Sequence, residues 1–137
     1  MPNFDQLKSE IEKILSNSPL DFEIRHSQLT LERLLKLDPN ADEALQIAAI
    51  AHDIERGITK ITEKDLKDLS NFNQFKKEHC IRSAEYTKEI LLKYKYPQDT
   101  IDKVTKLIAN HEFGGDKEGN LLMDADSLAY FSYNIPF

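Results

Sequence analysis

Residues 45–57 read "LQIAAIAHDIERG", and the fold is best understood outward from this stretch. Its first half is apolar and rich in alanine, which is typical of a helix that is buried on most of its surface. The small alanine side chains allow neighbouring helices to approach closely. His52 and Asp53 then place an imidazole beside a carboxylate at the end of this buried helix. A buried carboxylate without a partner costs roughly several kcal/mol, so this pair requires an explanation.

Apolar residues recur at helical spacing along the rest of the 137-residue chain, and no strand-like alternation of useful length is present. We therefore predict one all-α, single compact multi-helix domain over residues 1–137, with an extra N-terminal helix within residues 1–20. In that segment Asn3 is the expected N-cap of a helix that begins at Phe4. Further helices are predicted, in chain order, at residues 22–37, 41–54, 64–69, 76–94, 97–111 and 121–133.

The sequence also predicts details of the helix ends and of the buried faces. The 41–54 helix has two candidate N-caps: Asp38, which would place Pro39 at the first helical position, and Asn40 slightly later. Thr62 and Asp65 resemble a capping box. Inward-facing positions on the 76–94 helix are expected to be Cys80, Ile81, Ala84, Thr87, Ile90 and Leu91. We expect three aromatic residues of the last helix to lie in the core: Tyr130, Phe131 and Tyr133. One of them could instead stack on a nucleobase.

Composition excludes several classes of partner. The formal net charge is -6 and the sequence pI is about 5.2, which argues against binding a nucleic-acid polymer or an anionic membrane, because both reward a basic surface. No apolar run reaches the roughly 18 residues that a membrane span needs, and the N-terminus has no signal-peptide pattern. Cys80 is the only cysteine, so no internal disulfide forms. We expect a cytoplasmic protein; a homodimer stays open.

All four histidines lie near predicted helix ends: His26, His52, His79 and His111. Helix ends meet at the mouth of a helical bundle, so four separate segments can point at one spot. Asp124 and Asp126 open the last predicted helix. Neutral imidazoles and carboxylates together bind first-row divalent metals, and a cation there would explain the buried His-Asp pair. Taken singly, each histidine could instead cap helix carbonyls, and each aspartate could cap a helix start.

The ordered set of histidines and aspartates resembles the HD-domain superfamily of metal-dependent phosphohydrolases. The resemblance covers residues 22–131 and is carried by five segments: "IRHSQLTLERLLKL", "IAAIAHDIERG", "KEHCIRSAEYTKEIL", "VTKLIANHE" and "LLMDADSLAYF". It implies a core metal site formed by His26, His52, Asp53 and Asp126, and a second site formed by His79 and His111, with Asp53 bridging the two. Asp124 competes with Asp126 for the last ligand position. We favour Asp126 because it follows an alanine, as the aspartate of the superfamily usually does.

The resemblance implies one or two divalent ions (Mn, Fe, Co, Ni, Zn or Mg) and a small phosphorylated substrate. A metal-activated hydroxide would hydrolyse a phosphomonoester or phosphodiester of a nucleotide or other small metabolite. Asp53 and Arg56 are the expected catalytic residues, with Arg56 holding a phosphate oxygen; Arg25 reads better as a surface residue. Glu55 and Glu112 are candidates for fixing histidine tautomers. Two alternatives remain: an HD-type di-iron oxygenase and a non-catalytic metal-binding domain.

Overall fold

The computed structural model describes residues 3–20, 22–60 and 69–134, and for residues 69 and 132–134 it describes the backbone alone. This part of the chain forms helices, turns and loops without a strand, so the predicted all-α class is confirmed. The predicted 64–69 helix lies almost wholly outside the described residues, as do the Thr62–Asp65 cap and the Tyr133 side chain. The elements are α1 (Phe4–Leu15), α2 (Glu23–Leu37), α3 (Glu43–Ala51), α4 (Glu55–Ile58), the 3₁₀ turn η2 (Leu69–Asn71), α5 (Phe72–Lys93), α6 (Gln98–Ala109) and α7 (Lys117–Asn134).

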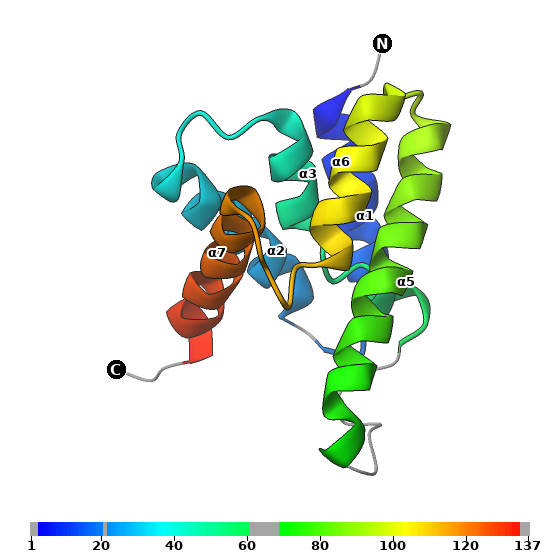
Figure 1. Ribbon diagram of the computed structural model, residues 1–137. Helices are drawn as coiled ribbons and strands as arrows, with labels where there is room; N and C mark the ends of the chain where they lie inside the picture. The colour runs from blue at the N-terminus through cyan, green and yellow to red at the C-terminus, as the bar shows by residue number, and fades with distance from the viewer. Residues whose placement is uncertain (1–2, 21, 61–68, 135–137) are drawn as a thin grey trace.

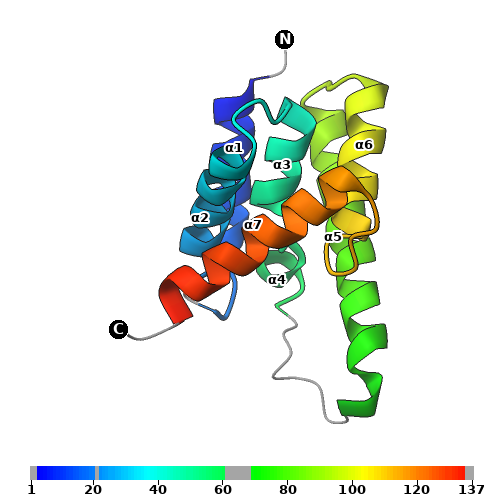
Figure 2. The same cartoon turned by 60° about the vertical axis from the view of Figure 1, so that its left-hand side comes forward.

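Helix α3 is the centre of the fold. It contacts α1, α2, α6 and α7, and α7 crosses obliquely over α2 and α3 in Figure 2. The stretch from Ile47 to Ala51 is at most 1% exposed, because the alanines let the surrounding helices pack closely. The Ser27 hydroxyl on α2 donates to the Ile50 carbonyl at 2.8 Å and ties the two helices together. No helix in the described part of the chain is long and apolar enough to span a membrane.

Local capping is partly as predicted. Asn3 caps α1, because its side chain accepts a hydrogen bond from the Gln6 N–H at 3.2 Å. The predicted cap of the 41–54 helix, Asp38 or Asn40, is wrong. Asp42 caps α3 by accepting from the Leu45 N–H at 2.9 Å. The Asp38 carboxylate instead accepts the Asn40 N–H at 3.0 Å, which is a local turn that competes with helix capping.

Helices α5 and α7 both begin four residues earlier than predicted. The first turns of α5 extend beyond the ends of the other helices (Figures 1 and 2), so no apolar stripe marks them in the sequence. The start of α7 is stabilised by Asp116, whose carboxylate accepts the Gly119 N–H at 2.6 Å. His79 therefore lies in the third turn of α5 rather than in the first, and Asp124 and Asp126 lie in the middle of α7.

Three apolar side chains that were predicted to be buried are half-exposed. Ile81 on α5 is 40% exposed, and Tyr130 and Phe131 on α7 are each 51% exposed. The buried face of α7 carries Ala125 and Ala129 instead, which lie one helical turn apart and are fully buried. The crossing of α7 over its neighbours, rather than the apolar character of its side chains, selects which face is covered.

Candidate metal centre

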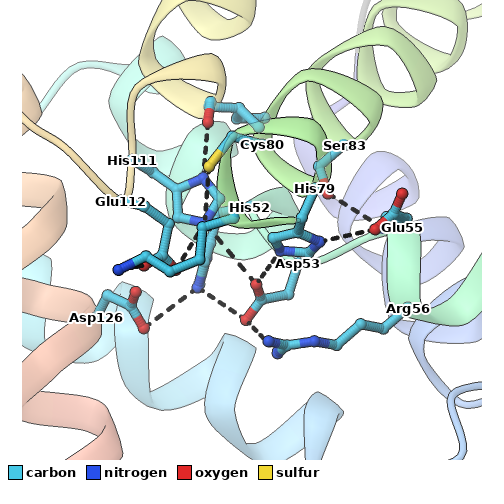
Figure 3. A network of polar contacts seen from close by, with 12 residues as sticks. His52, Asp53, Glu55, Arg56, His79, Cys80, Ser83, His111, Glu112 and Asp126 are labelled. Carbon is cyan, nitrogen blue, oxygen red and sulfur yellow. Dashed lines mark hydrogen bonds and ion pairs between the residues drawn. The ribbon is translucent and has the colours of Figure 1, made fainter. Parts of the chain in front are cut away.

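The four histidines come together at one end of α3. Figure 3 shows three of them, His52, His79 and His111. His26 comes from α2 and His79 from α5. His52 directly follows the end of α3, and His111 lies two residues after the end of α6. All four are at most 4% exposed. Successive rings lie in edge-to-face contact, with centroid separations of 5.2 Å for His26–His52, 5.0 Å for His52–His111 and 5.7 Å for His79–His111. The predicted gathering of every histidine at one place is what the fold produces.

His52 and His111 are oriented by the same local device. Each donates from Nδ1 to the carbonyl oxygen three residues earlier, Ala49 at 2.8 Å and Ile108 at 2.7 Å. A carbonyl oxygen only accepts, so the proton must be on Nδ1. The Nε2 atom of each ring is thereby turned toward the cluster. Capping a helix and presenting a ligand are therefore not alternatives for these residues, because one ring nitrogen does each.

His79 is oriented by a carboxylate rather than by the backbone. Its Nδ1 lies 2.9 Å from Oε1 of Glu55, which is fully buried. The other Glu55 oxygen accepts a hydrogen bond from Nε of Arg82. The predicted role of Glu55 as a partner of a histidine agrees with this contact. Nε2 of His79 consequently faces Asp53, with its Oδ1 atom 2.9 Å away.

Asp53 lies between two pairs of histidines. Its Oδ1 atom is 2.9 Å from Nε2 of His79 and 3.9 Å from Nε2 of His111. Its Oδ2 atom is 3.1 Å from Nε2 of His52 and 3.7 Å from Nε2 of His26. Each oxygen therefore serves a different pair, which is the arrangement expected of a bridging carboxylate.

Asp126, not Asp124, reaches the cluster. Oδ1 of Asp126 lies 2.7 Å from Nε2 of His26 and 3.4 Å from Nε2 of His52. Asp124 is exposed, because residues two apart on a helix point in nearly opposite directions. Glu112 is more peripheral, with Oε1 3.6 Å from Nε2 of His111. Arg25 is exposed, as the sequence suggested.

The donor set fits a divalent cation. Three histidines have their Nδ1 proton committed elsewhere, so their Nε2 lone pairs point at carboxylate oxygens. Lone pairs that face one another repel unless a proton or a metal ion lies between them. Three sets of donor atoms lie within 4.8 Å of one another: His26, His52 and Asp53; His52, His111 and Asp126; and Asp53, His79 and His111. Mixed imidazole and carboxylate donors suit first-row divalent metals.

The electrostatics of the cluster favour ionised carboxylates and a neutral His111, but they favour a protonated His52 until a cation binds. Burial opposes charge on His52, yet the carboxylates of Asp53 and Asp126 raise its pKa well above the usual range. Burial, together with the nearby His52, lowers the pKa of His111 to about 3, which keeps that imidazole neutral. Although burial acts in the opposite direction, Arg56 and His52 hold the pKa of Asp53 well below its usual range. A metal ion would displace the proton on His52 and compensate the ionised carboxylates.

A cavity of about 380 Å³ adjoins the cluster. His26, Asp53 and Asp126 line it together with Arg56 and Glu112. Its remaining walls include the aromatic rings of Phe22, Phe72 and Tyr130. This volume suits a small organic ligand. A larger and more open hollow of about 630 Å³ runs along α1, and none of the described residues lining it is a histidine.

Arg56 is held at the cavity wall by two carboxylates. Its Nη1 atom lies 3.1 Å from Oδ2 of Asp53 and 3.2 Å from Oε1 of Glu23. Glu23 is 2% exposed, and burial together with the nearby Asp53 raises its pKa to about 7. The predicted catalytic arginine is therefore beside the predicted bridging aspartate.

Sequence reasoning missed two residues of the network, Glu23 and Arg82. Each lies three positions from a cluster histidine, Glu23 before His26 and Arg82 after His79. Residues three apart share a helix face, so this spacing was a signal that could have identified both.

The comparison with protein families gives one match, which spans residues 4–136 and is described as a domain of unknown function, DUF4202. The chain belongs to the DUF4202 family. Neither a curated protein nor a solved structure matches the sequence. The description of the DUF4202 family assigns no activity, so the function of this member has to be argued from its buried cluster.

Proposed function

We propose that this protein is a metal-dependent phosphohydrolase related to the HD-domain superfamily. The observation that carries the proposal is the convergence of histidine Nε2 atoms and two aspartates beside a cavity of small-molecule size. The order of those residues along the chain is the order that the sequence resemblance requires. The substrate is a phosphomonoester or phosphodiester of a nucleotide or other small metabolite, and one or two divalent ions are the cofactor.

Divalent ions held by the cluster would supply a hydroxide nucleophile near neutral pH and would neutralise phosphate charge. One ion would be held by His26, His52, Asp53 and Asp126, and the other by His79, His111 and Asp53. Asp53 contributes one oxygen to each half and stays ionised because Arg56 is adjacent. The second nitrogen of His52, His79 and His111 is occupied by its acceptor, so these rings cannot turn away.

Arg56 contributes the phosphate contact. Its guanidinium borders the cavity and can donate to a non-bridging phosphate oxygen. Glu23 restrains the guanidinium beside Asp53, which reduces the side-chain entropy lost when substrate binds. The aromatic walls then accept the organic part of the substrate and exclude water from one side of the cavity.

The experiment is metal analysis of protein purified without chelator, followed by phosphate release from a panel of substrates. The panel contains nucleoside monophosphates, cyclic nucleotides and p-nitrophenyl phosphate mono- and diesters, each with Mn, Fe, Co, Ni, Zn or Mg. We expect metal-dependent hydrolysis that Asp53→Ala abolishes. Arg56→Ala should raise KM by about 10- to 100-fold, because it removes a charged hydrogen bond to the phosphate.

Asp124→Asn is the matched control, because it changes an exposed aspartate two positions from Asp126. It should leave hydrolysis unchanged. Iron-dependent O₂ consumption without phosphate release would support the di-iron oxygenase instead. Metal binding with neither reaction would contradict the hydrolase proposal and favour a non-catalytic metal-binding domain. Circular dichroism of each variant separates loss of activity from loss of folding.

A further inference from the structure

The two halves of the cluster differ in their negative charge. The first half consists of His26, His52, Asp126 and Oδ2 of Asp53, and we call it the Asp126 half. The second consists of His79, His111 and Oδ1 of Asp53, and we call it the His79 half. The Asp126 half has a carboxylate of its own, with Oδ1 of Asp126 2.7 Å from Nε2 of His26. The His79 half shares Asp53 and has a further carboxylate, that of Glu112, only at 3.6 Å from Nε2 of His111. A cation in the His79 half therefore receives less charge compensation from its direct ligands.

A further carboxylate lies directly behind the His79 half. Glu55 is fully buried, and its Oε1 atom accepts the His79 Nδ1 proton at 2.9 Å. Its Oε2 atom accepts from Arg82, and its backbone N–H donates to the Ser83 hydroxyl at 3.2 Å. These three partners occupy positions i, i+3 and i+4 of α5, which form one helix face. Figure 3 shows Glu55 reaching His79 from the side opposite Asp53.

We propose that Glu55 is a positioning residue that enables the His79 half to hold the second cation, and that Arg82 balances its charge. This inference rests on the proposed function and adds an order of loading, with the Asp126 half filling first. A carboxylate that accepts the distal N–H of a ligating histidine fixes the tautomer and increases the basicity of the ligating nitrogen. Arg82 offsets the cost of burying that carboxylate before the cation binds.

The test is titration of the full chain with Mn²⁺, followed by calorimetry and electron paramagnetic resonance. The wild-type protein should bind two ions and give the spectrum of an exchange-coupled pair. Glu55→Gln keeps a side-chain oxygen for the His79 N–H but removes the charge. This variant should bind the second ion about 10- to 100-fold more weakly and the first ion with unchanged affinity. Its spectrum should be that of an isolated Mn²⁺ ion.

Glu78→Gln is the matched control. The Glu78 carboxylate is 3.7 Å from Nη1 of Arg82 on the same helix and is half-exposed, so its removal changes the surroundings of Arg82 without touching His79. It should retain both ions. Arg82→Gln gives a second measurement if Glu55→Gln does not fold. It should retain both ions, lower the melting temperature of the metal-free protein, and show a larger stabilisation by Mn²⁺ than the wild type.

Four results overturn the inference. The first is Glu55→Gln binding two ions with wild-type affinities, or losing both ions together. The second is loss of the second ion in Arg82→Gln. The third is binding of a single ion by the wild-type protein, which refutes the order of loading but leaves the proposed function intact. Failure of the wild-type protein to bind any ion with Mn²⁺ or the other five metals refutes the proposed function as well.

Discussion

Substitution of Gly57 by alanine should destabilise the protein, because this glycine permits close contact between α1 and α4. A Cβ atom at position 57 would lie 2.2 Å from the carbonyl oxygen of Ile14 and 2.7 Å from its carbonyl carbon. Ordinary van der Waals contact begins at 3.4 Å, so the two helices would have to separate by about 1.2 Å. The atoms in conflict belong to the backbone, so a change of side-chain rotamer cannot relieve the clash.

The magnitude follows from two opposing effects. Overpacking typically costs about 1–3 kcal/mol, and a backbone clash belongs at the upper end of that range. Alanine regains up to about 1 kcal/mol through its better helix propensity. The net loss in the free energy of unfolding should be about 2 kcal/mol. For 137 residues the entropy of unfolding is about 0.29 kcal/mol/K, so the melting temperature should fall by about 7 °C.

The assay is thermal and urea denaturation followed by circular dichroism. Gly119→Ala is the control, because its new Cβ would meet the carboxylate oxygen of Asp116, a side chain that can move. Moving Asp116 removes its hydrogen bond at the start of α7, at a cost of about 1 kcal/mol, and the better helix propensity of alanine offsets that loss. It should change the free energy of unfolding by less than about 1 kcal/mol. A Gly57→Ala protein within about 0.5 kcal/mol of the wild type would refute the close α1–α4 approach. Gly57 is adjacent to Arg56, so a displaced α4 should also weaken metal binding.

Three further outcomes test other parts of the structure. Asp126→Asn should lose at least about 10-fold in Mn²⁺ affinity by calorimetry, whereas Asp124→Asn should not. Mn²⁺ at 100 times its Kd should add about 2.7 kcal/mol of stability and raise the melting temperature by about 9 °C in scanning calorimetry, and chelator should reverse the change. Asp42→Ala should cost about 1 kcal/mol in urea denaturation, because it removes the α3 cap. Burial raises the pKa of Asp42, but hydrogen bonds from Lys103 and the Leu45 N–H outweigh burial and lower it. The stability difference between Asp42→Ala and the wild type should therefore persist at neutral pH and disappear as the pH falls through that lowered pKa.

The sequence by itself determined the helical class and the members of the cluster. Apolar spacing reveals a helix wherever one face is buried, and the Asn3 cap is a local contact within one turn. Histidines are few in this chain, and all four are used. The choice of Asp126 over Asp124 was also available, because Asp126 follows an alanine, as the aspartate usually does in the superfamily that the sequence resembles.

The tertiary structure decided features that depend on contacts between distant segments. Glu55 and Arg82 are 27 positions apart, and their interaction exists only because α4 packs against α5. Tyr130 and Phe131 are half-exposed because the crossing of α7 covers a different face. Local propensity describes a segment on its own, whereas burial and charge pairing are properties of what packs against it. The candidate ligands could therefore be identified from the sequence, whereas the pairing of Glu55 with His79 and Arg82 required the fold.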